Sequence, residues 1–108
     1  MLKLPPQPDR CELCERPVAA LTRHHLIPKH LHRKKRIQKL FDREDLITRT
    51  LWVCRPCHNA IHKARTEVEL GLYFNTREAL LEIEELRVFV AWLKDKPEGF
   101  VPKFRRGG

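Results

Sequence analysis

The sequence predicts a small α+β domain in which two strands and a helix are followed by a helical C-terminal third. Two segments rich in strand-forming residues, 21–27 and 46–53, and a helical spacing of apolar residues in the last third lead to this prediction. A chain of 108 residues corresponds to one domain. We divide it into an N-terminal unit (11–66), C-terminal helices (67–96) and a basic tail (97–108).

The first strand ends at Pro28, because proline fixes φ and has no amide donor. Residues 29–45 are too polar for a core and are expected to form a basic loop. The second strand leads directly into Cys54, and the pattern then changes to that of a helix over residues 58–65. The i, i+4 spacing places His58 and His62 on one face of this helix, about 6 Å apart at Cβ, so both can reach one ion.

The C-terminal third has the pattern of core helices. Thr76 is a plausible N-cap, and the helix after it either continues or restarts. Pro97 is expected to end the last helix. Trp92 and Tyr73 could stack on bases, but large rings in so small a protein favour a place in the core. The apolar stripe expected to face the core consists of Leu86, Phe89, Val90 and Leu93.

The four cysteines fall into two pairs, Cys11-x-x-Cys14 and Cys54-x-x-Cys57. Four thiolates at about 2.3 Å complete a tetrahedral zinc shell without an open position, so the pairs predict a closed, structural zinc site. The alternative is two disulfides in a secreted protein. Residues 1–6 contain no apolar signal-peptide core, which favours zinc and a soluble, cytoplasmic protein. No apolar run approaches the roughly 20 residues of a membrane span.

Positive charge is concentrated in the N-terminal half. The formal net charge is +8 and the sequence pI about 9.7, with 15 basic and 6 acidic residues in 1–66. The densest stretch, 29–39, has no acidic residue, which favours binding to phosphates of a nucleic acid over an ordinary solvated loop. The expected contacts are Lys29, His30, His32, Arg33, Lys34, Lys35, Arg36 and Lys39. His30 and His32 are alternatively extra metal ligands.

The order of strand, basic loop, strand, cysteine pair and helix resembles the HNH endonuclease superfamily. The residues that carry this resemblance are Cys11 and Cys14, Arg23-His24-His25-Leu26-Ile27-Pro28 and Cys54-Arg-Pro-Cys57-His58-Asn-Ala-Ile-His62. It covers residues 11–63, and segments 69–81 and 89–92 are similar to a subgroup of small stand-alone HNH proteins. The resemblance implies a ββα-metal (His-Me finger) fold that hydrolyses DNA phosphodiester bonds, with double-stranded DNA as the expected partner and low sequence specificity.

The resemblance also implies roles for the histidines. His24 would bind the catalytic metal and His25 would be the general base that takes a proton from the attacking water. Neighbouring residues on a strand point to opposite sides, so the pair can divide these tasks. With His58 and His62, His24 would form a three-histidine set similar to that of the colicin nucleases. Such a site accepts Mg²⁺, Mn²⁺, Ni²⁺ or Zn²⁺ and leaves positions open for phosphate and water.

One position departs from the family pattern. The central asparagine of the motif corresponds in register to Arg49. The hydroxyl of Thr50 or Thr48 is expected to take over its hydrogen bond to the loop that holds the base. Asn59 is not the motif's asparagine and is expected to face solvent or DNA. Two functions follow: an endonuclease, monomeric or weakly dimeric, or a nucleic-acid-binding module whose HNH centre has decayed.

Overall fold

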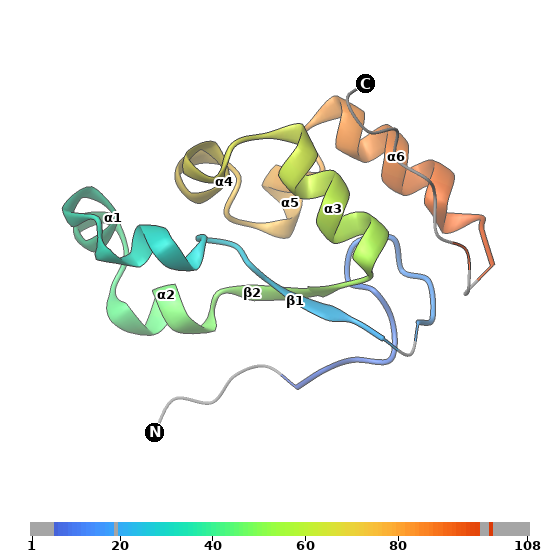
Figure 1. Cartoon of the computed structure of the whole chain (residues 1–108), viewed down its shortest axis with the longest axis horizontal. Coiled ribbons are helices and arrows are strands. Elements are labelled where there is room, and N and C mark those ends of the chain that lie inside the picture. Colours follow the sequence, from blue (N-terminus) through green and yellow to red (C-terminus); the bar gives the residue numbers. More distant parts are fainter. Residues whose placement is uncertain (1–5, 19, 98–99, 101–108) are drawn as a thin grey trace.

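The computed structural model describes residues 6–18, 20–97 and 100, and it is a mixed α+β structure (Figure 1). Its elements in chain order are β1 (Thr22–His25), the 3-10 helix η1 (Lys29–Arg33), α1 (Lys35–Leu40), α2 (Arg43–Thr48), β2 (Thr50–Val53), α3 (Arg55–Ala64), α4 (Glu67–Tyr73), α5 (Arg77–Leu80) and α6 (Glu84–Lys94). Most of the expected basic tail, 97–108, lies outside the described residues. No helix in the described ranges is long and apolar enough to cross a membrane.

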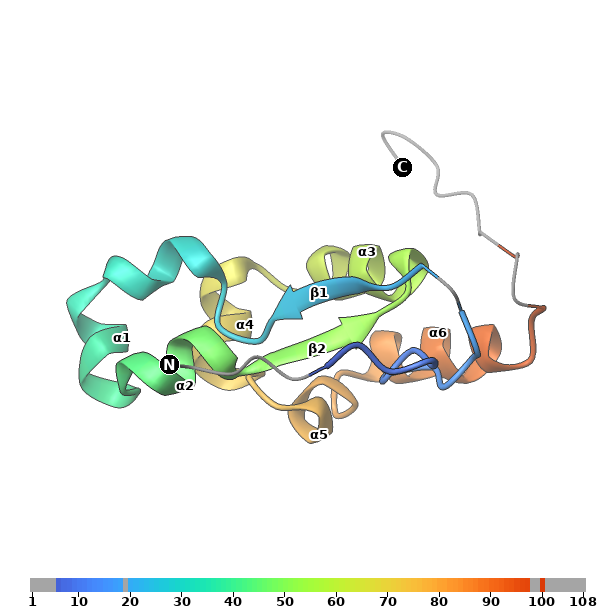
Figure 2. The same ribbon diagram turned by 90° about the horizontal axis from the view of Figure 1, so that it is seen from below.

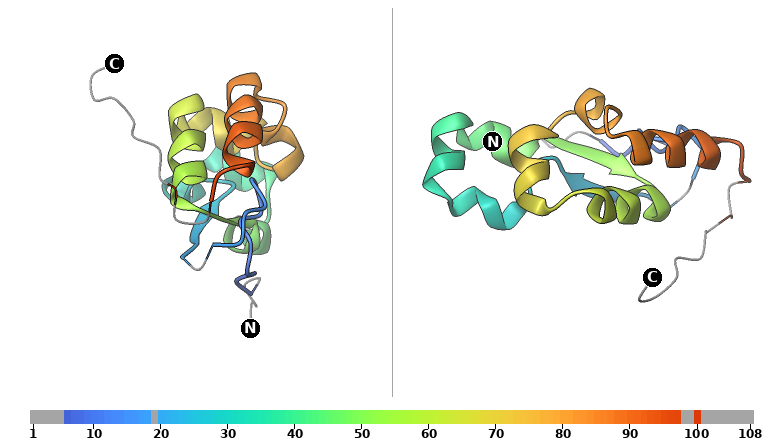
Figure 3. Two further views of the ribbon diagram at one scale, coloured as in Figure 1. Left: turned by 90° about the vertical axis from the view of Figure 1, so that its right-hand side faces the viewer. Right: turned by 90° about the horizontal axis from the view of Figure 1, so that it is seen from above.

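The two strands form an antiparallel pair in which His25 is opposite Thr50 and Thr22 is opposite Val53. Helices α3 and α6 gather on one side of this pair, and η1, α1 and α2 extend from one end of it (Figures 1 and 2). In the end-on view the strands and the N-terminal segment lie below the packed helices (Figure 3). The first predicted strand is thus confirmed in a shorter form, as residues 22–25. Helix α3, which follows β2 in the chain, packs against β1.

The predicted second strand was too long, because its first residues belong to α2. Asp42 is the N-cap of this helix, and its side chain accepts a hydrogen bond from the amide of Asp45. Together with acidic residues in the first turn, this cap favours a helix through Thr48. Only residues 50–53 of the predicted strand pair with β1.

Residues 29–45 are not a loop outside the core, as the sequence had suggested. They form η1, α1 and the start of α2, and Leu31 and Ile37 are buried with Ile27 and Leu46 in a small second core. The charged side chains of the segment remain exposed around this core. A few apolar residues are therefore enough to fix a helical arm whose surface is basic.

The main core lies between the sheet, α3 and the C-terminal helices. Thr66 begins α4 with a capping box to Glu69, and Thr76 caps α5 as predicted, accepting from the amide of Ala79. Helix α6 is a separate helix, so the chain restarts after α5. Its residues Leu86, Val90 and Leu93 are buried and Phe89 is partly buried, which confirms the predicted stripe.

The two aromatic rings predicted for the core are exposed instead. Tyr73 is 63% exposed and Trp92 is 44% exposed, so that prediction was wrong. The stripe at positions 86, 90 and 93 occupies the inner face of α6, which leaves position 92 on its outer side. There Trp92 packs edge-on against Phe100, and the Lys96 ammonium lies 4.8 Å from its ring centroid.

Candidate metal centres

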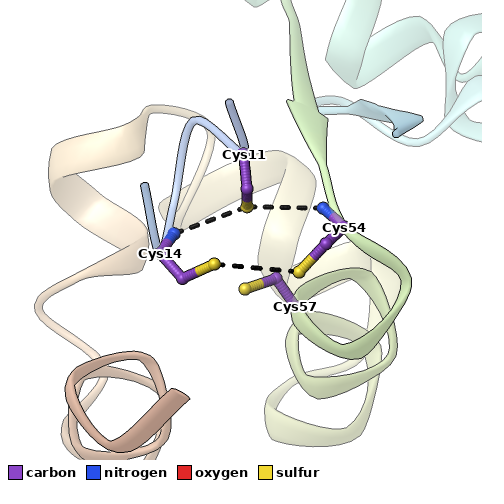
Figure 4. Close-up of side chains that lie close together, drawn as sticks. All are labelled: Cys11, Cys14, Cys54 and Cys57. Atoms are coloured by element: carbon purple, nitrogen blue, oxygen red, sulfur yellow. Dashed lines mark hydrogen bonds between the residues drawn. The ribbon is translucent and has the colours of Figure 1, made fainter. Parts of the chain in front are cut away.

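The four cysteines form one buried cluster in which the Sγ atoms all lie within 4.8 Å of one another (Figure 4). The Sγ atoms of Cys14 and Cys54 are 3.8 Å apart, and all four cysteines are free of disulfides. The disulfide alternative is therefore wrong for this structure. Four sulfurs at these separations suit a tetrahedral zinc ion, which four thiolates would hold without an open position.

Two short loops present these sulfurs. The first turns at Glu15, which has a φ of 66°, and the amide of Cys11 donates to the carbonyl of Arg16. The second runs from the end of β2 into α3, where Cys54 is the N-cap residue. Amides from both loops point at one sulfur, since Cys14 N and Cys54 N lie 3.4 and 3.3 Å from the Sγ of Cys11. Such N–H···S contacts favour a thiolate, the form that binds metal.

The pKa values of these thiols are shifted in opposite directions. Hydrogen bonding with Cys11 and then with Cys54 lowers the pKa of Cys14. Hydrogen bonding with Cys11 and with Cys14 raises the pKa of Cys57. Four buried sulfurs cannot all ionise beside one another without a cation. The cluster therefore has the four sulfur donors of a structural metal site, and it needs a cation to balance the charge of its thiolates.

Three histidines form a second cluster at the contact between β1 and α3. The side chain of His24 is buried, with 1% of the residue exposed, and its ring centroid lies 5.3 Å from those of both His58 and His62. The centroids of His58 and His62 are 5.0 Å apart, and one ring nitrogen from each of the three lies within 4.8 Å of the others. The predicted i, i+4 pair on the helix thus meets the strand histidine, and the set matches three ligands of a metal site with open positions.

Both ring nitrogens of His24 are buried without a hydrogen-bond partner in the described residues. A buried polar atom that lacks a partner costs on the order of 1–3 kcal/mol, so such atoms are rare unless something else binds them. A divalent cation held between the three rings would coordinate one of these nitrogens. The unpartnered nitrogens of His24 therefore support a metal at this site, and this support does not depend on the spacing of the histidines in the sequence.

Thr22 fixes the tautomer of His58. Its hydroxyl lies 3.1 Å from the carbonyl of Val53, to which it donates, and 2.9 Å from Nδ1 of His58. Because the threonine proton is used on the carbonyl, Nδ1 of His58 carries the proton and donates to Thr22. The lone pair of His58 is then on Nε2, free for a metal. Thr22 was not among the predicted site residues, because its contact with position 58 is visible only in three dimensions.

Two of the three clustered histidines, His24 and His58, are uncharged at neutral pH. Burial, followed by the proximity of His58 and His62, lowers the pKa of His24 to about 3. Burial and then His62 lower the pKa of His58 to about 4. Neutral imidazole is the form that binds metal, so protons do not compete with a cation for these two rings until the solution is acidic.

A hollow of about 350 Å³ opens beside the three histidines. It is lined by Arg23, His24, His25, Pro28, Lys29, His30, His58, His62 and Glu67. His25 is half-buried there, and burial followed by the charge of Arg23 lowers its pKa, so its imidazole is available as a base at neutral pH. On the rim, Nδ1 of His30 lies 2.6 Å from a carboxylate oxygen of Glu67, a pair that the sequence gave no reason to expect.

No family model and no solved structure matches this chain. Among curated proteins it is similar to YisB of Bacillus subtilis (strain 168), which is described as uncharacterized. The two sequences are 34% identical over 87 residues, or 81% of this chain and 75% of YisB. The chain belongs to the YisB family. Because YisB is described as uncharacterized, this membership brings no activity with it.

The remaining predicted residues, Thr48, Thr50 and Asn59, do not line the hollow and differ in what they contact. Thr48 donates its hydroxyl to the carbonyl of Glu44 in its own helix. Thr50 lies opposite His25, and its buried hydroxyl has no partner among the described residues. Neither threonine therefore makes the expected hydrogen bond to the loop. Asn59 is exposed on α3, as predicted.

The basic residues of the arm are presented to solvent, with one exception among the histidines. Nε2 of His32 lies 2.8 Å from the carbonyl of Ile27 and donates to it, so His32 braces the turn after β1. His30 is paired with Glu67. Neither belongs to a metal-ligand cluster in the described part of the chain. The exposed lysines and arginines of η1, α1 and the residue between them are Lys29, Arg33, Lys34, Lys35, Arg36 and Lys39.

Proposed function

We propose that this protein is a metal-dependent HNH endonuclease that hydrolyses DNA phosphodiester bonds. The observation that carries the proposal is the histidine cluster, in which His24 has two orphaned ring nitrogens while His25, its neighbour in the chain, lines the same hollow. A metal site with open positions beside a neutral imidazole has the parts needed for hydrolysis of a phosphodiester.

The arrangement of elements supports the family assignment. Strand β1 carries the histidine pair, β2 pairs with it, and α3 carries the other two histidines and packs against β1. This order is the one expected of a ββα-metal unit. The four-cysteine cluster joins β2 and α3 to the N-terminal loop, where a buttressing zinc would be expected.

In the proposed mechanism His24, His58 and His62 would hold one divalent ion, and His25 would accept a proton from the attacking water. The ion, when bound, polarises the scissile phosphate and stabilises charge on the leaving 3′ oxygen. Water attack in line with that oxygen leaves a 5′-phosphate on the other product. The half-buried position of His25 and its lowered pKa keep the imidazole unprotonated and ready to act.

The chain just after His25, at the end of β1, is fixed even though the motif's asparagine is replaced by Arg49. The amide of Leu26 donates to the carbonyl of Arg49 at 3.0 Å, a bond that does not depend on the side chain at that position. The Arg49 guanidinium reaches the side-chain oxygen of Asn75 at 3.3 Å and a carboxylate oxygen of Asp45 at 3.6 Å. These contacts hold the start of β2 against α2 and the end of α4, and they support an intact rather than a decayed centre.

DNA would approach over the basic arm. The exposed cations of η1 and α1 begin at Lys29, which itself lines the hollow, so a backbone lying across the arm would pass the histidine cluster. Lysine and arginine side chains bind phosphates without reading the bases. The expected substrate is therefore DNA with little sequence preference.

A nucleic-acid-binding module with a decayed centre is the second candidate. The unpartnered hydroxyl of Thr50, next to His25 in the sheet, favours it, because the group that should replace the asparagine does not hold the loop. The basic arm would serve either function equally well. Measured DNA cleavage distinguishes the endonuclease from the binding module.

The test is conversion of supercoiled plasmid to open-circle or linear DNA. Protein with one zinc per chain is assayed with added Mg²⁺, Mn²⁺ or Ni²⁺, comparing wild type, His25→Ala and the control Asn59→Ala, an exposed residue of the same helix that carries His58. The proposal expects cleavage by wild type and by the control but not by His25→Ala. Plasmid that is retarded in a gel but remains uncut with every metal supports the binding module.

A further inference from the structure

Arg16 is a buried cation beside the cysteine cluster. It is 4% exposed, and its Nη2 lies 3.7 Å from the Sγ of Cys54. Its Nη1 donates to the carbonyl of Pro97 at 2.8 Å and approaches that of Phe100 at 3.4 Å. None of the ion pairs in the described part of the chain pairs Arg16 with a carboxylate. The sulfurs are thus the anionic groups that this guanidinium meets.

Charge balance explains why a buried arginine is favourable beside the cysteine cluster. An unpaired buried charge costs several kcal/mol, so a cation is retained inside a protein where an anion faces it. Four thiolates around one divalent ion carry a net charge of −2, and a guanidinium donating to one sulfur offsets part of it. Neutral thiols would leave Arg16 with carbonyl oxygens alone.

We propose that Arg16, although not a metal ligand itself, helps the cysteine site to retain its structural zinc. Its guanidinium does so by compensating the thiolate charge of Cys54. Residues in this position commonly change metal affinity by about 10- to 100-fold when they are replaced. The inference is independent of the nuclease proposal, because it concerns the cysteine site alone.

The same side chain links the zinc site to the end of α6. Its two carbonyl contacts are with residues beyond that helix, and Phe100 packs against Trp92 with ring centroids 5.4 Å apart. When zinc leaves, the guanidinium loses its anion and the contacts it makes with this segment weaken. The exposed indole of Trp92 should therefore report on the occupancy of the cysteine site.

The first test follows transfer of zinc to a chromogenic chelator from wild type, Arg16→Lys and Arg16→Gln. Glutamine keeps a donor without the charge, and lysine keeps the charge without the planar fork. Zinc should leave Arg16→Gln about 10 to 100 times faster than wild type, with Arg16→Lys in between. The control is Lys94→Gln, which removes an exposed cation whose Nζ is 3.2 Å from Glu15 in the same loop; its rate should match wild type.

Equal rates of zinc loss for wild type and Arg16→Gln would overturn the proposal, as would equal rates for the lysine and glutamine variants. A second measurement keeps zinc in place. In a Trp52→Phe background, the emission of Trp92 is recorded for zinc-loaded protein with Arg16 and with Arg16→Gln. The Arg16→Gln spectrum should differ from that of the protein with Arg16; identical spectra would refute the link between the zinc site and the α6 segment.

Discussion

The hydroxyl of Thr22 lies 2.9 Å from Nδ1 of His58 and donates its own proton to the carbonyl of Val53. Thr22, the first residue of β1, thereby sets the tautomer of His58, a predicted metal ligand. It lies two positions before His24 in the same strand. One strand thus provides both a ligand and the group that orients another ligand, and β1 is the rigid element on which the histidine cluster is built.

Thr22→Val should weaken divalent metal binding at the histidine cluster by about 10- to 100-fold, because the His58 ring loses its orienting acceptor. Zinc at the cysteines should be unaffected. Calorimetric titration of Mn²⁺ or Ni²⁺ into zinc-loaded protein measures the effect. Thr48→Val is the matched control, since that hydroxyl bonds within its own helix to Glu44; equal losses in both variants would refute the role of Thr22.

Cys54→Ser should abolish the cooperative unfolding transition. Cys54 is buried at the junction of β2 and α3, and small domains that depend on a structural metal unfold when a ligand is lost. His25→Ala should stay folded, with a free energy of unfolding within about 1 kcal/mol of wild type. Circular dichroism melts measure both variants. A wild-type melting temperature for Cys54→Ser would remove the structural-metal interpretation.

Protein without metal at the histidine cluster should lose stability in mild acid. The pKa values of His24 and His58 are lowered to about 3 and about 4 in the folded state, against an ordinary 6.5, so the unfolded chain binds more protons between these limits. The free energy of unfolding should therefore fall as pH drops from about 6.5 towards 4. Urea unfolding at several pH values measures the slope. His24→Leu should flatten it, and an unchanged slope would contradict the burial argument.

Replacing three cations of the basic arm should weaken DNA binding in a salt-dependent way. The triple change of Lys34, Lys35 and Arg36 to alanine removes up to three phosphate contacts, which would reduce the slope of log K against log salt concentration by about 2 to 3. Binding is measured by fluorescence anisotropy at several NaCl concentrations. Arg87→Ala, an exposed cation on α6, is the control and should leave the slope at its wild-type value.

The members of both candidate metal-binding clusters could be predicted from the sequence, because much of their geometry is local. A CxxC pair presents two sulfurs from one turn, and an i, i+4 pair presents two imidazoles from one helix face. The strand histidine could be added because the strand pattern and the basic loop fit one family. The cysteine and histidine clusters of the structure contain the residues that these spacings predicted.

The helices within 29–45 could not be predicted, because Leu31 and Ile37 are isolated among charged residues and show no helical period. Their burial depends on packing against Ile27 and Leu46, which lie outside this segment and meet it only in the folded chain. The roles of Thr22 and Arg16 are hidden for the same reason, since each acts on a residue more than 30 positions away. The exposure of Trp92 could not be derived from the size of its ring, which says nothing about the helix face that it occupies.

If one divalent ion at the three histidines cuts DNA together with His25, metal binding and DNA nicking must rise and fall together. The most direct measurement titrates Mn²⁺ into protein that holds one zinc per chain and records bound manganese and plasmid nicking in the same samples. Nicking should rise in parallel with the binding of one manganese per chain, and both should be lost in His58→Ala and in His62→Ala while zinc remains. Nicking that persists in these variants, or manganese binding that is complete without any nicking by wild type, would contradict the account.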